Sequence, residues 1–187
     1  MYIFIYIRLH ITCEIKIIQV KGKLIKIDAS SFIYSIKMDW LKVLKELYED
    51  LIITSSVHQE VILNGKFKGK PDAFIGEKLI KKYDIQIHDV EKNSEVEMGL
   101  GEGETDTILN AIELKCSCLI DDKKAIRIAE SFDLQVLSVP ISLLDAYKHQ
   151  KINDGKFEKF FQKWIIAAHP SYEDIFLIKK SKELMNE

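Results

Sequence analysis

The sequence has few cysteines and no apolar run long enough to cross a membrane. Its cysteines number three, and Cys116 and Cys118 lie in an apolar segment typical of a β-strand. An odd number of cysteines in such a context indicates reduced core thiols rather than a disulfide framework, which predicts a cytoplasmic protein. A Cys-x-Cys pair without a nearby histidine or a second cysteine pair is also a poor zinc site.

A marked excess of either charge is absent as well. The 187 residues include 27 basic and 29 acidic side chains, and 47% of the residues are hydrophobic. This balance argues against a protein that coats nucleic acid with its whole surface, so any contact with nucleic acid must be local. The length suits one domain with a full hydrophobic core, and no internal repeat or low-complexity segment is present.

Residues 1–22 form an N-terminal extension of different character. Met1–Ile7 is apolar, but charged side chains from Arg8 onward end the run before it could span a bilayer, so no membrane association is expected. The segment also lacks the basic start and small-residue cleavage site of a secretory signal. Tyr2–Ile7 and Ile15–Val20 have the composition of edge strands, and a translation start assigned upstream of the true one is the alternative.

From Leu24 onward, strand-like and helix-like segments alternate. Strands are expected at Leu24–Asp28, Leu51–Thr54, Ile85–Val90, Cys116–Asp121 and Leu134–Val139. Helices are expected for the stripe from Trp40 to Leu51, after a cap at Ser55 or Ser56, from Pro71, and at Glu104–Leu114 and Lys123–Phe132. This order predicts an α/β fold of three layers (α/β/α) around a mostly parallel sheet, which binds ligands beyond the carboxyl ends of its strands.

Acidic residues stand where these strands end or where the helices begin. Asp28 ends the first strand, Asp121 and Asp122 end the fourth, Glu104 opens a helix, and Glu60 follows the second strand. The strand ends belong to one rim of the sheet, and the inward stripe of its helix directs Glu104 to that rim. Carboxylates that converge there cannot all stay ionised unless a cation neutralises them. Oxygen ligands without a Cys/His set predict Mg²⁺ or Mn²⁺.

Taken singly, each acid also has a structural interpretation. An aspartate at a strand end commonly forms a turn or caps a helix, and Asp106 competes with Glu104 for the role of ligand. Other acid-based enzymes fit less well. A phosphatase of the haloacid dehalogenase type needs a second aspartate two residues after Asp28, where Ser30 stands, and a phosphate-accepting receiver domain needs its acidic pair early in the chain.

Four motifs carry a resemblance to a known family. They are Ile27-Asp28-Ala29-Ser30, Ser56–Val61, Gly103–Ile108 and Leu119–Ala125. In order and spacing the segment 23–152 resembles the PIN-domain nucleases, particularly the VapC-like toxin ribonucleases of prokaryotic toxin–antitoxin pairs. The chain departs from many relatives at Ile120, where a threonine is common, and in the spacing between Glu104 and Ile108.

The resemblance implies a PIN-like nuclease domain at residues 23–152 that hydrolyses RNA with Mg²⁺ or Mn²⁺. It implies Asp28, Glu60, Glu104 and Asp122 as catalytic residues, and Asp28, Glu104, Asp121 and Asp122 as metal ligands. It also implies an antitoxin protein as a partner. The alternative is a catalytically inactive PIN-like module that binds RNA or protein.

Two further segments bear on partners. Lysines 66, 68 and 70 on a glycine-containing loop, with lysines 78, 81 and 82 beyond, predict a basic patch for an RNA backbone, the alternative being a solvated face. Residues 153–187 are expected to form a C-terminal helical extension packed on the domain, with an aromatic stripe from Phe157 to Ala168 and a second helix from Tyr172. These helices could equally form a homodimer surface or receive an antitoxin peptide.

Overall fold

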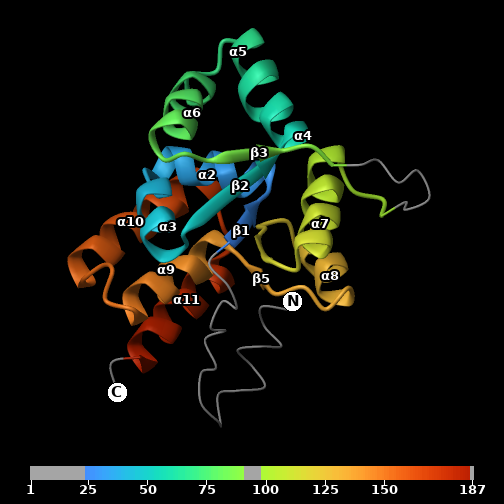
Figure 1. Cartoon of the computed structure of the whole chain (residues 1–187). Helices are drawn as coiled ribbons and strands as arrows, with labels where there is room; N and C mark the ends of the chain where they lie inside the picture. The colour runs from blue at the N-terminus through green and yellow to red at the C-terminus, as the bar shows by residue number, and fades with distance from the viewer. Residues whose placement is uncertain (1–23, 91–97, 186–187) are drawn as a thin grey trace.

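Five parallel strands form the centre of the structure, in the order β3-β2-β1-β4-β5 (Figure 1). The computed structural model describes residues 24–90 and 98–185. The strands are β1 (Leu24–Ile27), β2 (Asp50–Thr54), β3 (Gln86–His88), β4 (Ser117–Leu119) and β5 (Val136–Leu137). The predicted three-layer α/β architecture is therefore confirmed. The edge strands expected within residues 1–22 lie outside the described residues.

The strand order reverses direction at β1. From β1, strands β2 and β3 follow on one side and β4 and β5 on the other, and Ile27 pairs with Leu119 of β4. The Asp28 backbone N–H continues this pairing by donating to the Leu119 carbonyl at 3.1 Å. In open α/β sheets, ligands bind outside the carboxyl ends of the strands at such a reversal. The ends of β1 and β4 are thus the place in this fold where a site is expected.

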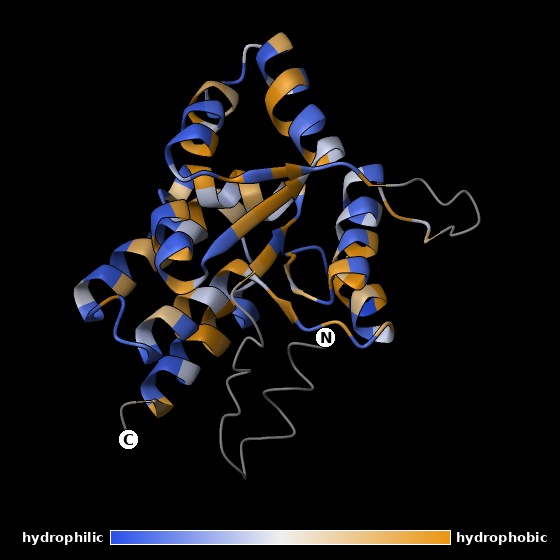
Figure 2. Ribbon diagram, viewed as in Figure 1, coloured by the Kyte–Doolittle hydropathy of each residue, from blue (hydrophilic) through white to orange (hydrophobic). Residues whose placement is uncertain are grey.

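Helices cover both faces of the sheet and bury the central strands (Figure 2). On one face the larger core lies beneath α2 (Ala29–Met38), α3 (Leu41–Leu47) and α9 (Val139–Lys148), while α10 (Asp154–Ala168) packs against α2 and α9, and α11 (Tyr172–Leu184) packs against α9. The other face packs against α7 (Glu102–Leu114) and α8 (Lys123–Ser131). Alternation along β1 sends Ile25 and Ile27 into the larger core and leaves Lys26 on the α7 side. Burial of both faces explains why the strands are apolar runs.

Several boundaries differ from the sequence prediction. The stripe from Trp40 to Leu51 is divided, because α3 ends at Leu47 and Leu51 belongs to β2. Helix α2, which was not predicted, precedes α3 and ends at Asp39, which adopts a left-handed conformation with φ 60° and donates its N–H to the last turn. Strand β5 is shorter than expected because Pro140 lies in the first turn of α9, a position that proline tolerates without losing a hydrogen bond.

The C-terminal aromatic stripe is part of the larger core. Phe157, Phe161 and Trp164 of α10 are buried, and Phe160 meets Trp40 edge to face with ring centroids 4.8 Å apart. Helix α10 packs against α2 and α9. These rings are therefore used for packing within the chain. No helix among residues 24–90 and 98–185 is long and apolar enough to span a bilayer.

A pair of antiparallel helical segments projects beyond β2 and β3 (Figure 1). After β2 the chain runs without a break through α4 (Ser55–His58), the π-helical turn η1 (Gln59–Leu63) and α5 (Asn64–Phe67), and it returns through α6 (Pro71–Lys82). The two limbs approach closely at Gly65, where a Cβ atom would lie 2.8 Å from the Ala73 Cβ. We call η1, α5 and α6 together, residues 59–82, the arm.

Candidate active site

The first element of the site is the fully buried carboxylate of Asp28 at the end of β1. Asp28 is also the N-cap of α2, since its Oδ1 accepts a hydrogen bond from the Ser31 backbone N–H at 2.8 Å. The Ser30 hydroxyl donates to Oδ2 at 2.7 Å. Burial raises the pKa of Asp28 to about 6 against these hydrogen bonds, which favour the ionised form.

The second element is Asp121, which follows β4. The Ser31 hydroxyl donates to its Oδ2 at 2.7 Å, and the Val139 backbone N–H donates to its Oδ1 at 3.2 Å. Ser31 therefore contacts both carboxylates, through its N–H to Asp28 and through its hydroxyl to Asp121. Burial, with a smaller contribution from the neighbouring charge of Asp28, raises the pKa of Asp121 to about 7 against the hydrogen bonds from Ser31 and Val139, which favour the ionised form.

No described lysine or arginine forms an ion pair with Asp28 or Asp121, although two like charges in a buried site repel each other. Both carboxylates also raise the pKa of the partly buried Tyr34 hydroxyl, after the larger effect of its own burial. Tyr34 lies two turns along the helix that Asp28 caps, and its proximity to the pair was not predicted from the sequence. The i, i+3 spacing from Ser31 would have indicated it.

Asp122, the next residue, is exposed and caps a helix. Its Oδ1 accepts hydrogen bonds from the backbone N–H groups of Lys124 and Ala125, both at 2.8 Å, and so caps α8. Among the described residues, no hydrogen bond joins the Asp122 side chain to Asp28 or Asp121. Of the two adjacent acids at the end of β4, it is therefore Asp121 that the structure brings to Asp28.

Glu104 lies in the first turn of α7 and is partly buried. Its carboxylate accepts a hydrogen bond from the Gly101 backbone N–H at 3.0 Å, which closes the start of the helix. Its negative charge raises the pKa of Asp28, after the larger effects of burial and of the serine hydrogen bonds. Glu104 therefore shares the electrostatic environment of Asp28.

Glu60 is exposed and belongs to the π-helical turn η1. A Cβ atom at position 103 would lie 3.3 Å from Glu60 Oε2 and 3.4 Å from a Val57 methyl group, so Gly103 allows the helix that carries Glu60 to approach the start of α7. This contact brings Glu60 beside the residue that precedes Glu104. Single π turns within helices often occur at functional sites.

A cleft of about 400 Å³ opens where these helices meet. It is lined by polar side chains from α4, η1 and α7 and by the segment after β3: Ser55, Ser56, Gln59, Glu60, Asn64, Asp89, Val90, Glu102, Gly103 and Asp106. Among the predicted catalytic residues only Glu60 lies in its wall. Asp106, the alternative to Glu104, also lines it. Asp89 follows the end of β3, as Asp28 follows β1, and the same strand-end rule would have found it.

The candidate site offers oxygen ligands and few nitrogen or sulfur ligands. Cys116 and Cys118 are buried free thiols, as predicted, and burial raises the pKa of both. Within the described ranges, no three Asp, Glu, His or Cys side chains are gathered closely enough to form a complete metal site. Mg²⁺ commonly binds through one or two carboxylates and keeps several water ligands, so the pair of Asp28 and Asp121 fits the donor set of a hard divalent cation.

Comparison with known proteins identifies the family and supports the fold. The PIN-domain family model DUF3368 matches residues 24–167, and this range includes α10. The structure is similar to that of a PilT N-terminus domain protein from the hyperthermophilic archaeon Sulfolobus solfataricus, with a TM-score of 0.51 and 17% identity over 67% of this chain and 95% of the other. No curated protein matches the sequence. The chain therefore belongs to the PIN-domain family, whose fold is generally that of a nuclease.

Proposed function

We propose that this protein is a divalent-metal-dependent endoribonuclease whose metal site is built on Asp28 and Asp121. One observation carries the proposal: the fully buried carboxylate of Asp28 and the partly buried carboxylate of Asp121 share Ser31 at the point where the strand order reverses, and no basic side chain among the described residues forms an ion pair with either. Such an arrangement destabilises a metal-free protein, and a bound cation removes the cost.

The acidic side chains and the serines have different roles in this proposal. Asp28 and Asp121 would hold the cation, while Glu104 and Glu60, on the two helices that meet beside them, supply further oxygen ligands or orient its water ligands. Ser30 and Ser31 fix the carboxylates of the pair by hydrogen bonds. When bound, a divalent ion lowers the pKa of a coordinated water and offsets the charge of a phosphodiester.

The direct test incubates the purified protein with mixed RNA in Mn²⁺, in EDTA, and in Mn²⁺ with the Asp28→Asn variant. We expect cleavage only with wild-type protein in Mn²⁺. Isothermal titration of Mn²⁺ into both proteins gives a readout that is independent of turnover, and the variant should bind Mn²⁺ more weakly. RNA binding without cleavage in any condition would instead support the alternative, an inactive PIN-like binding module.

We extend the proposal to the toxin role that the resemblance implies. A ribonuclease toxin should stop the growth of a bacterial host when its expression is induced, and the Asp28→Asn variant, expressed at the same level, should leave growth unchanged. Normal growth with an active enzyme would remove the toxin role, and with it the antitoxin partner, but would leave the nuclease assignment standing.

A further inference from the structure

We propose that the arm binds single-stranded RNA, with Phe67 stacked on an unpaired base and Lys68 and Lys70 in contact with phosphates. The inference deepens the proposed function and rests on it, since it names the surface that would hold the RNA substrate of the same site. It goes beyond the basic patch in the sequence because it assigns a stacking residue and excludes duplex RNA.

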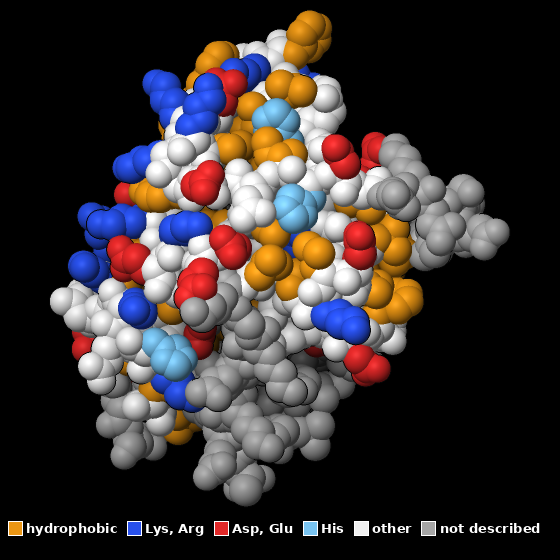
Figure 3. Space-filling view, in the orientation of Figure 1, with side chains coloured by type: hydrophobic (Ala, Val, Ile, Leu, Met, Phe, Trp, Pro, Cys, Tyr) orange, Lys and Arg blue, Asp and Glu red, His pale blue; other side chains and the backbone are white. Residues whose placement is uncertain are grey.

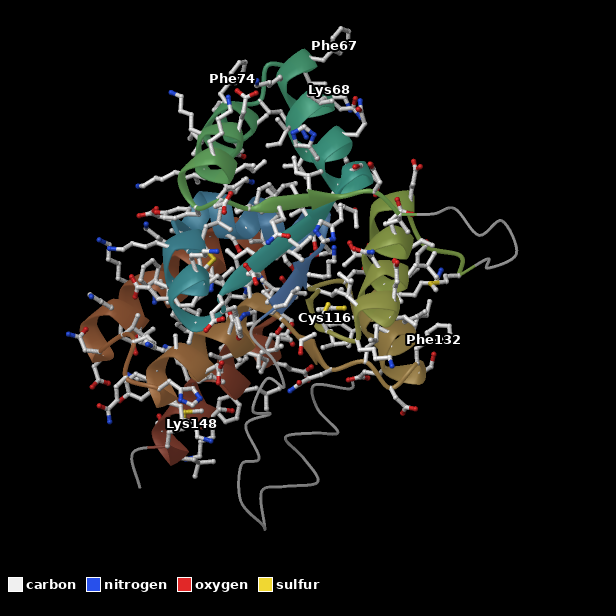
Figure 4. All side chains as sticks on the ribbon, in the orientation of Figure 1. Phe67, Lys68, Phe74, Cys116, Phe132 and Lys148 are labelled. Atoms are coloured by element: carbon white, nitrogen blue, oxygen red, sulfur yellow. The ribbon has the colours of Figure 1, made fainter. Side chains whose placement is uncertain are left out.

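Phe67 is an aromatic side chain that folding leaves in water. It is 93% exposed at the end of α5, where it points away from the rest of the molecule (Figure 4). Phe74 of α6 is 49% exposed on the neighbouring limb, and the Lys66 ammonium lies 5.7 Å from its ring centroid. A phenylalanine that packs on nothing contributes little to stability, and exposed aromatic rings next to cations are the features with which proteins bind unpaired bases.

The charge of the arm is opposite to that of the cleft beneath it. Six lysines and two acidic residues lie between Asn64 and Lys82, although the whole chain has a net charge of −2. Lys66 is paired with Glu77 at 2.6 Å. Lys68 and Lys70 are exposed, and neither forms an ion pair with any carboxylate in the described ranges. Basic side chains gather beside the hydrophobic tip (Figure 3), so a polyanion is the complementary ligand.

The arm is continuous with the candidate active site. Glu60 lies in its first turn, in the wall of the cleft, and Phe67 follows seven positions later on the same uninterrupted helical segment. At 1.5 Å per residue the two are about 10 Å apart along the axis, which equals roughly three stacked nucleotides at about 3.4 Å each. A strand bound beside Glu60 would therefore reach the tip within a few nucleotides.

A second copy of the chain is a less suitable occupant. Pairing one arm with another by a two-fold axis would set lysine-rich surfaces against each other, which like charges oppose. Stacking on Phe67 needs a base whose face is free, so the substrate class is single-stranded and largely independent of sequence.

The test measures RNA affinity without metal, so that cleavage does not interfere. Fluorescence anisotropy in EDTA would follow binding of labelled 12-nucleotide uridine and adenosine strands and of a 12-base-pair RNA duplex. Phe67→Ala should weaken binding of both single strands about 5- to 100-fold. Phe132→Ala is the matched control, because Phe132 is 47% exposed at the end of α8, away from the arm (Figure 4), and it should leave the affinity unchanged.

The lysines are tested by salt dependence. For single strands each phosphate contact contributes about 0.7 to the slope of log affinity against log salt concentration. The double variant Lys68→Gln/Lys70→Gln should therefore lower the slope by about 1.4. Lys148→Gln is the control, since Lys148 is exposed at the end of α9, remote from the arm (Figure 4), and its slope should equal that of the wild type.

Three results would overturn the inference: single-strand affinity unchanged by Phe67→Ala, equal or tighter binding of the duplex, or a loss of oligomers in light scattering when Phe67 is replaced. Circular dichroism melting checks that the variants are folded.

The nuclease proposal and the arm proposal can be contradicted independently of each other. Cleavage in Mn²⁺ that Phe67→Ala leaves unaffected, with unchanged binding, removes the arm alone, whereas single-strand binding that depends on Phe67 without any cleavage removes the nuclease alone.

Discussion

Lys26 in the middle of β1 and Asp28 at its end are both fully buried, and both have a pKa shifted toward the neutral form. Their surroundings differ. Asp28 accepts hydrogen bonds from two serines and has a second carboxylate beside it. The Lys26 ammonium has no hydrogen-bond partner among the described residues. Burial lowers its pKa to about 8. The thiols of Cys116 and Cys118, whose own pKa values burial raises, carry no charge to compensate it, and the charge of Glu113 offsets only part of the effect of burial.

Burial of a charged group is therefore not enough to identify a functional site. Asp28 lies at the reversal of the strand order, where ligands can approach, and its neighbours keep the carboxylate in one orientation for a ligand that is still to bind. Lys26 lies between the sheet and α7 and has no exposed surface for a ligand to contact. Replacing the charge of Asp28 should therefore impair function, whereas replacing the charge of Lys26 should raise stability.

The largest expected effect separates the two adjacent acids at the end of β4. Asp121→Asn should reduce the rate of RNA cleavage in Mn²⁺ by at least about 100-fold, because a metal ligand supplies several kcal/mol of transition-state stabilisation. Asp122→Asn should retain nearly full activity, because asparagine caps a helix as well as aspartate does. Initial rates at saturating Mn²⁺ measure both. The reverse ranking would move the site to the exposed acid and break the comparison with Lys26.

Lys26→Met is expected to stabilise the protein. The pKa of Lys26 is about 8 in the folded protein and 10.5 when exposed, so between these values the unfolded chain binds more protons and stability rises with pH. Below pH 8 the ammonium remains buried and charged, and methionine should raise the free energy of unfolding at pH 7 by about 1–3 kcal/mol.

Urea unfolding at pH 7 and pH 10 checks this expectation, since the gain should shrink at the higher pH. Lys148→Met on the surface provides the control and should change the free energy of unfolding by less than about 0.5 kcal/mol. A loss of stability in Lys26→Met at pH 7 would show that the buried ammonium has a favourable partner.

The contrast between these positions also explains which parts of the fold and of the site could be predicted from the sequence. Strand ends are marked by periodicity and by the acid that follows, so Asp28 and the end of β4 could be placed without coordinates. The choice between Asp121 and Asp122 could not, because it depends on which carboxylate turns toward Ser31 and which toward the α8 backbone. Helix α2 was missed because its residues Ala29–Met38 carry few of the features that end or begin a helix, apart from Asp28 as cap.

Metal binding should depend on pH at the acidic pair. The pKa values of Asp28 and Asp121 are raised from 3.8 to about 6 and about 7, so the folded protein holds protons there that the unfolded chain releases at lower pH. The stability of the metal-free protein should fall as pH rises through this window. Mn²⁺ must displace these two protons, so its affinity should rise by about tenfold or more per pH unit between pH 5 and 7 and then level off.

Thermal melting with and without Mn²⁺ at pH 5, 6, 7 and 8 measures this dependence, and the variant Asp28→Asn/Asp121→Asn serves as control because it has no carboxylate at either position. The stabilisation by Mn²⁺ should grow with pH in the wild type and be small and constant in the variant. An equal shift at pH 5 and pH 8 in the wild type would place the ion elsewhere.

The smallest expected effect concerns Asp122, the exposed neighbour of the pair. Asp122→Ala removes the acceptor for two N–H groups at the start of α8 and should lower the free energy of unfolding by about 0.5–2 kcal/mol, while Asp122→Asn should change it little. Cleavage by Asp122→Ala should be unchanged at temperatures where the variant is folded. An activity loss at constant stability would assign Asp122 to catalysis, and the two roles at the end of β4 would then no longer be separable.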